Sequence, residues 1–145
     1  MRTAMRRGDR GSAAVELAIL VPSVLLFFAA VMVAGRYSLA RQAGEAAAYD
    51  AARTASLART EATARTEART AALNAYQAAG LTCDPLDARL VDPTGFQEPV
   101  GVAATVTVLV VCEVQFEDIS MPGVPGSFRI ESTFTSPLDT YRSRG

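Results

Sequence analysis

The stretch "RGSAAVELAILVPSVLLFFAAVMVAG", residues 10–35, decides how this chain is organised. From Leu17 to Gly35 it runs for 19 residues without a charge. A helix rises about 1.5 Å per residue and the hydrocarbon of a bilayer is about 30 Å thick, so this run nearly spans a membrane. The sequence therefore predicts a membrane-spanning helix over residues 12–35, in which Pro22 removes one backbone donor.

The charges before this helix predict its orientation. Residues 1–11 form a short basic leader, in which Asp9 alone offsets the arginines at positions 2, 6, 7 and 10. Positive charge is retained on the cytoplasmic side of a membrane. We therefore expect a single-pass protein of the cell membrane, with a cytoplasmic N-terminus and an extracytoplasmic region after Gly35.

Residues 36–79 contain no proline and one glycine, Gly44, and are rich in Ala, Arg, Glu and Thr. This composition predicts one extracytoplasmic helix that continues the membrane helix and ends at Gly80, since glycine is a common helix stop. Unbroken, its 44 residues would extend about 66 Å.

The near-repeat "ARTEATARTEART", residues 58–70, leaves two interpretations of this helix open. It is either a solvated face, with Glu61 and Arg65 paired four residues apart, or part of a small-residue stripe that another helix approaches closely. No large apolar residue lies between Leu57 and Leu73, so we expect this stretch to be weakly held and frayed. The stripe comprises Ala40, Ala43, Ala47, Ala51, Ala55, Ala58 and Ala62.

Residues 80–145 predict a small β domain. "ATVTVLVVCEVQF", residues 104–116, alternates with period two, which gives a strand with one dry face from Val102 to Phe116. Shorter strands are expected at 88–91 and at 127–134, after the turn "MPGVPG" (121–126); Phe128, Ile130 and Phe134 of the last strand point inward. Leu73 and Tyr76 are placed to cover the dry face. The predicted fold class is α+β, with an antiparallel sheet of about three strands packed on the end of a long helix.

The two cysteines, Cys83 and Cys112, are compatible with one disulfide or with two buried thiols. An exported domain favours the disulfide, which would clip the exit of the helix to the central strand. A loop of about 30 residues would then contribute roughly 3–4 kcal/mol by chain entropy.

The composition argues against several classes of function. The chain has no histidine and no lysine, and it shows no catalytic triad, no phosphate-binding glycine loop and no metal-spaced cluster. Asp84, Asp87 and Asp92 lie close together but at turn-like positions, which a solvated loop explains. No basic stripe with aromatics indicates nucleic-acid binding. We therefore expect no enzyme activity, no cofactor, no metal, no nucleic acid and no small-molecule substrate.

Glu16 is the carboxylate near the start of the apolar run, and three roles are open for it. It snorkels to the headgroups, or it relays protons, although the helix offers no second ionisable group. In the third role it pairs with the α-amine created by cleavage after Gly11. Ser12 would then be the first residue and Glu16 the fifth, and in a bundle of such helices the carboxylate of one subunit would meet the amine of its neighbour.

A glycine followed five residues later by glutamate resembles the prepilin cleavage motif, and "RGSAAVELAILVPSVLL" resembles the N-terminus of TadE-like pseudopilins of the tight-adherence (Flp) pilus apparatus. The likeness continues in "RQAGEAAAYDAARTAS" and in "FTSPLDTYR", which is similar to the ending of actinobacterial members. The resemblance implies a pilin-like fold and a minor structural component that supports pilus assembly or secretion. It also implies cleavage between Gly11 and Ser12 by a prepilin peptidase, and partners among other pilin-like subunits and the assembly platform.

Two alternatives have no connection to pili. In one, the first 35 residues are an ordinary signal peptide, with Val33 and Gly35 weakly satisfying the small-residue rule for its cleavage. In the other, the chain is an uncut single-pass anchor carrying a small β domain.

Overall fold

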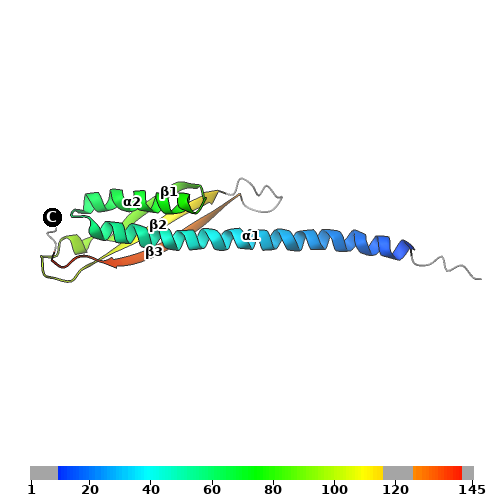
Figure 1. Ribbon diagram of the computed structural model, residues 1–145, viewed down its shortest axis with the longest axis horizontal. Coiled ribbons are helices and arrows are strands. Elements are labelled where there is room, and N and C mark those ends of the chain that lie inside the picture. Colours follow the sequence, from blue (N-terminus) through cyan, green and yellow to red (C-terminus); the bar gives the residue numbers. More distant parts are fainter. Residues whose placement is uncertain (1–9, 116–125, 142–145) are drawn as a thin grey trace, which may run out of the picture. The chain divides into compact units, whose positions relative to one another are not determined.

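The computed structural model describes residues 10–115 and 126–141 of the 145 residues. Its elements are α1 (Arg10–Leu57), α2 (Glu61–Ala78), β1 (Cys83–Asp92), a short 3-10 helix η1 (Thr94–Phe96), β2 (Thr105–Gln115) and β3 (Ser127–Pro137) (Figure 1). The predicted α+β class is confirmed. The chain divides into two compact units, 1–37 and 38–145, and α1 contributes to both. The arginines at positions 2, 6 and 7 and most of the predicted 121–126 turn lie outside the described residues.

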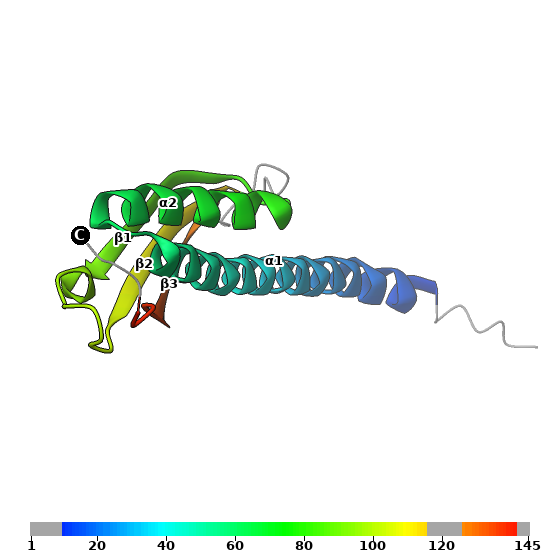
Figure 2. The ribbon, with the colours of Figure 1, turned by 60° about the vertical axis from the view of Figure 1, so that its left-hand side comes forward.

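The unbroken helix predicted over 36–79 is wrong, because α1 ends at Leu57 and α2 begins at Glu61. Thr60 has extended backbone geometry, and its hydroxyl accepts a hydrogen bond of 3.2 Å from the N–H of Thr63. A threonine in this position satisfies a donor that a new helix leaves open, so it caps α2. Helix α2 therefore runs back beside the last turns of α1 (Figure 2).

The helix stop predicted at Gly80 is confirmed, although the helix that ends there is α2. Helix α2 ends at Ala78, and Gly80 follows with φ of +70°, a conformation that L side chains rarely adopt. The N–H groups of Gly80 and Leu81 donate to the carbonyls of Gln77 and Tyr76 at 2.9 and 3.0 Å. These bonds close the last turn and direct the chain into β1.

The sheet has the order β1-β2-β3, with both pairs antiparallel. The predicted dry face of β2 is confirmed, since alternate residues of the strand are buried: Val106, Val108, Val110, Cys112 and Val114. Strand β1 is longer than the predicted 88–91 and includes Asp84 and Asp87, which the sequence placed in a loop. Asp84 is exposed and Asp87 is half-buried, because Leu86, which lies between them in this edge strand, is the residue that faces the core.

Helix α1 follows β3 along the inner face of the sheet. Gly44 lies against Ile130, Tyr49 stacks edge-on against Phe134 with ring centroids 4.9 Å apart, and the Ser136 hydroxyl donates to Ser56 at 3.1 Å. The twelve residue steps from Gly44 to Ser56 of α1 cover about 18 Å, and the six steps from Ile130 to Ser136 of β3 cover about 20 Å. The two segments therefore remain side by side over this length. Helix α2 packs against β1.

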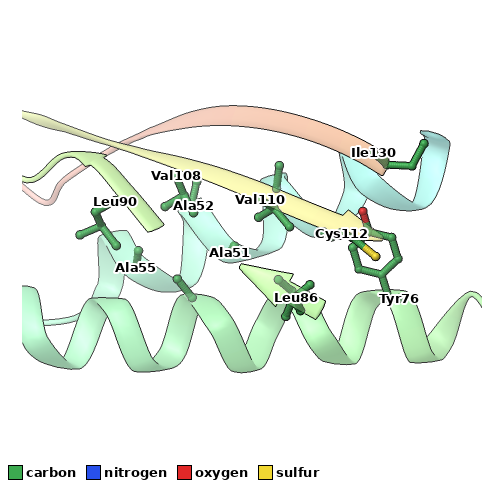
Figure 3. Close-up of a cluster of buried hydrophobic side chains, with 14 of the residues drawn as sticks. Ala51, Ala52, Ala55, Tyr76, Leu86, Leu90, Val108, Val110, Cys112 and Ile130 are labelled. Atoms are coloured by element: carbon green, nitrogen blue, oxygen red, sulfur yellow. The ribbon is translucent and has the colours of Figure 1, made fainter. Parts of the chain in front are cut away.

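The core between the helices and the sheet is built largely from alanine. The buried helical residues are Ala40, Ala43, Ala47, Ala48, Ala51, Ala52 and Ala55 of α1, and Ala64, Ala68, Ala72 and Tyr76 of α2. Figure 3 shows alanines of α1 in one cluster with valines of β2 and leucines of β1.

Two further expectations about this region need correction. The stretch between Leu57 and Leu73 is not weakly held, because Ala64 and Ala68 are fully buried in it. Alanine holds the helix there by letting backbones approach closely, without a large side chain. Of the two residues expected to cover the sheet, Tyr76 is fully buried, whereas Leu73 remains 37% exposed.

Candidate functional site

The N-terminal part of α1 carries three of the residues singled out in the sequence. Gly11 and Ser12 lie in its first turns. Glu16 is exposed, and within the described part of the chain no hydrogen bond or ion pair engages its carboxylate. A carboxylate on an otherwise apolar helix surface has no intramolecular partner here, so any partner it has comes from outside the described residues.

The surface around Glu16 is apolar and uncovered. Its exposed residues include Val15, Leu17, Ile19, Leu20, Leu25, Leu26, Phe27, Phe28, Val31 and Met32, each more than half exposed. Among the described helices, α1 is long and apolar enough to cross a membrane, by length and composition. A helix that is apolar all round is stable in lipid or inside a bundle but not in water. Helix α1 therefore fits a single-pass membrane anchor.

Pro22 lies inside this apolar helix, where it lacks the N–H that would bond to the carbonyl four residues before it. One residue later, the Ser23 hydroxyl donates to the carbonyl of Ile19 at 2.9 Å. A helix in hydrocarbon needs its polar groups hydrogen-bonded internally, and this bond satisfies the Ser23 hydroxyl within the helix itself.

The structure joins Cys83 and Cys112 in a disulfide, with their Cα atoms 5.6 Å apart. Cys83 opens β1 directly after the turn at Gly80, and Cys112 lies on the buried face of β2. The bond ties the exit of α2 to the central strand, as the sequence predicts. The two cysteines are 29 positions apart, and the closed segment includes the whole β1–β2 connection.

Gly44 of α1 and Tyr76 of α2 meet at a close contact with Ile130 and Ser132 of β3. A Cβ atom placed on Gly44 would lie 2.7 Å from Cγ2 of Ile130 and 3.0 Å from both the Tyr76 hydroxyl and the Ser132 hydroxyl. The Tyr76 hydroxyl is buried and makes no hydrogen bond within the described residues. Because burial disfavours the charged phenolate, the pKa of Tyr76 is raised to about 12.

Stability is therefore expected to fall as the pH rises from 10 to 12. An unfolded tyrosine releases its proton near pH 10, whereas folded Tyr76 retains it to about pH 12, so deprotonation draws the chain toward the unfolded state. Two pH units correspond to about 2–3 kcal/mol of unfolding free energy. Denaturant unfolding of wild type and Tyr76→Phe at pH 10 and pH 12 measures this loss. Between the two pH values, the unfolding free energy of the variant should fall by about 2–3 kcal/mol less than that of the wild type. Tyr141→Phe, at a side chain 88% exposed, is the control; equal losses in wild type and Tyr76→Phe would contradict the assignment.

A shallow hollow of about 450 Å³ lies where α1 ends, lined by Arg53, Ser56 and Leu57 and by the segment from Ser136 to Tyr141. This hollow was not predicted from the sequence. Its two sides are about 80 residues apart in the chain, and no local motif marks either of them. The local sequence feature that could have indicated it is an arginine and a leucine four residues apart, Arg53 and Leu57, near the end of a helix.

The described residues contain no group of three or more potential metal ligands. Asp92, one of the three clustered aspartates, accepts hydrogen bonds from the side chain and the backbone of Thr94, and these bonds lower its pKa. Its carboxylate thus closes the turn into η1, an ordinary local role for an aspartate.

Comparison with known proteins gives one finding. Residues 11–53 match the family described as "TadE-like protein". No curated protein and no solved structure matches the chain. The matched segment begins at Gly11, includes Ser12 and Glu16, and ends inside the half of α1 that packs on the sheet. Residues 11–53 of this chain are therefore similar to the TadE-like family.

Proposed function

We propose that this protein is a minor pilin-like (pseudopilin) structural component of a tight-adherence (Flp) pilus assembly or a related secretion apparatus. The observation that carries the proposal is the TadE-like segment, which begins with an uncovered apolar stretch of helix, residues 13–35, in which Glu16 is the single carboxylate. An apolar helix of this kind is stable only when lipid or other helices cover its surface, which supports a function in assembly. No catalytic role is assigned to the protein.

The domain is proposed to lie outside the cytoplasm. The arginine-rich leader favours a cytoplasmic N-terminus by the positive-inside rule. A disulfide in the domain is in keeping with an oxidising compartment. In this arrangement the partners are the membrane, other pilin-like subunits, the assembly platform and a prepilin peptidase that cuts between Gly11 and Ser12.

The N-terminal sequence of the protein purified from membranes of its own host tests this proposal. A chain that begins at Ser12 is the expected result, because it gives Glu16 an α-amine partner on a neighbouring subunit. A start at Arg36 would make the apolar helix a discarded signal peptide and the protein a secreted domain. An intact Met1 would indicate a plain single-pass anchor in which Glu16 snorkels.

Glu16→Ala is expected to leave membrane insertion intact and to impair association with partner pilins. Removing the carboxylate makes the helix more apolar, so insertion does not suffer, but the partner amine loses its counter-charge in a place where it is poorly hydrated. The measurement is co-purification from detergent-solubilised host membranes. Glu67→Ala, at an exposed carboxylate of α2, is the matched control. Undiminished co-purification of the Glu16 variant would refute the charge-pairing role.

A further inference from the structure

We propose that the disulfide between Cys83 and Cys112 is a redox-sensitive latch that holds one corner of the sheet closed. When the bond is reduced, the segment 82–85 leaves β2 while the rest of the domain stays folded. This inference does not depend on the pilus role. It follows from the pairing at the start of β1, from the burial of the two cysteines, and from the anchors on either side of the segment.

The first part of β1 is weakly paired with β2. Cys83 pairs with Val114 and Leu86 pairs with Cys112, so β1 has two residues between these pairs where β2 has one. Such a β-bulge leaves a residue unpaired and disrupts the ladder locally. One of the two bulged residues is Pro85, whose nitrogen has no hydrogen to donate. The ladder therefore contributes little to holding this segment.

The other contacts of the segment are few and lie near solvent. The N–H of Gln115 donates to the carbonyl of Thr82 at 3.2 Å, and the side-chain amide of Gln115 donates to the carbonyl of Asp84 at 3.1 Å. Every residue of the segment except Cys83 is exposed, so little buried apolar surface keeps it in place. Cys83 is half-buried, and its bond to the fully buried Cys112 attaches the segment to the core.

Both flanks of the segment are anchored independently of the disulfide. On the helix side, Leu81 is buried and its N–H donates to the carbonyl of Tyr76 at 3.0 Å. On the strand side, the stretch from Leu86 to Leu90, both buried, pairs in unbroken register with residues 108–112 of β2. Figure 3 shows these two leucines in one cluster with the valines of β2. Opening is therefore confined to the four residues between the anchors.

The burial of the two cysteines sets the order of their reaction with a dithiol. A thiolate of the reductant attacks the sulfur of Cys83, because Cys112 has no exposed surface. A mixed disulfide forms, and Cys112 leaves as a thiolate that takes up a proton. The second thiol of the reductant then attacks the reductant's own sulfur in the mixed disulfide and releases Cys83, which takes up the second proton. Two electrons pass to the protein, and the reductant becomes a disulfide.

Opening of the latch uncovers the end of β2. Val114, which has no exposed surface in the closed state, loses its partner on β1. An unpaired strand edge is a template for pairing with another extended chain. Because an oxidising compartment keeps the disulfide formed, this edge is presented only by the reduced protein.

Hydrogen–deuterium exchange of the full chain in detergent, with and without excess dithiothreitol, tests this proposal. The reporter is the amide of Gln115, which is bonded to Thr82 in the closed state. Its exchange rate should rise about tenfold or more on reduction, which corresponds to about 1.4 kcal/mol of opening free energy. Exchange in residues 86–90 and in β3 should not change. Cys83→Ala should show the same opening without the reductant and should not respond to it.

Alkylation of the reduced protein gives an independent readout. Cys83 leaves with the segment, whereas Cys112 stays on the paired part of β2, so iodoacetamide should modify Cys83 first. A Gln115 amide that ignores the reductant, a rise in exchange throughout the sheet, or equal alkylation rates at the two cysteines would each overturn the proposal. The pilus role would be unaffected, because the N-terminal sequence tests it separately.

Discussion

Cys83→Ala is expected to lower the free energy of unfolding of the domain by about 3–4 kcal/mol. The disulfide joins two cysteines 29 positions apart, and opening it returns conformational freedom to the unfolded chain. Cys83 is the position to change, because Cys112 is fully buried on the sheet and its replacement would also disturb the core. Denaturant unfolding of the full chain in detergent, followed by circular dichroism, gives the measurement.

A reducing agent supplies the control for this variant. Wild type under reducing conditions should lose about as much stability as Cys83→Ala loses, and the variant itself should not respond to the reductant. A variant within about 1 kcal/mol of the oxidised wild type would show that the disulfide does not hold the domain together.

Gly44→Val is expected to destabilise the domain by about 3 kcal/mol, the upper end of overpacking effects. A Cβ at this position already lies 2.7 Å from Ile130 Cγ2, closer than such atoms approach, and Tyr76 and Ser132 block the other directions. Gly44→Ala should cost about 1 kcal/mol, because alanine's better helix propensity offsets part of the clash. The denaturant midpoint of the full chain measures both.

Gly35 provides a matched position in the same helix. A Cβ at Gly35 has no atom within 4 Å in the described structure, so Gly35→Val should leave the unfolding of the domain unchanged. Equal effects at Gly35 and Gly44 would show that the loss arises from the helix itself and not from its contact with the sheet.

The break between α1 and α2 shows why part of the fold escaped prediction. The tetrapeptide Ala-Arg-Thr-Glu occurs at 58–61 and again at 64–67. In the first copy the Thr60 hydroxyl accepts from a backbone N–H and caps a helix, whereas in the second the Thr66 hydroxyl donates to the carbonyl of Ala62 within a helix. Identical local sequences thus take different roles, and only the packing of α2 on β1 decides between them.

Other features were predictable because their signal is periodic or unique. Alternation of valine with other residues fixes the buried face of β2, since strand side chains alternate between faces. A chain with two cysteines has one possible intramolecular pairing. The alanine core was harder, because alanine is common on exposed and on buried helix faces alike. The hollow beside Arg53 was not predictable, since it forms only when the end of α1 meets the end of β3.

The alanine interface has a consequence for mutagenesis. Truncation to alanine, the usual survey of a protein's residues, changes nothing at Ala47, Ala51 or Ala55, although these side chains are fully buried. Such a survey would report that the paired helices are indifferent to substitution. Replacement with bulkier residues would reveal the opposite. The natural variation that this domain accepts is therefore expected to be one-sided, with growth of these side chains excluded while the outer helix faces vary freely.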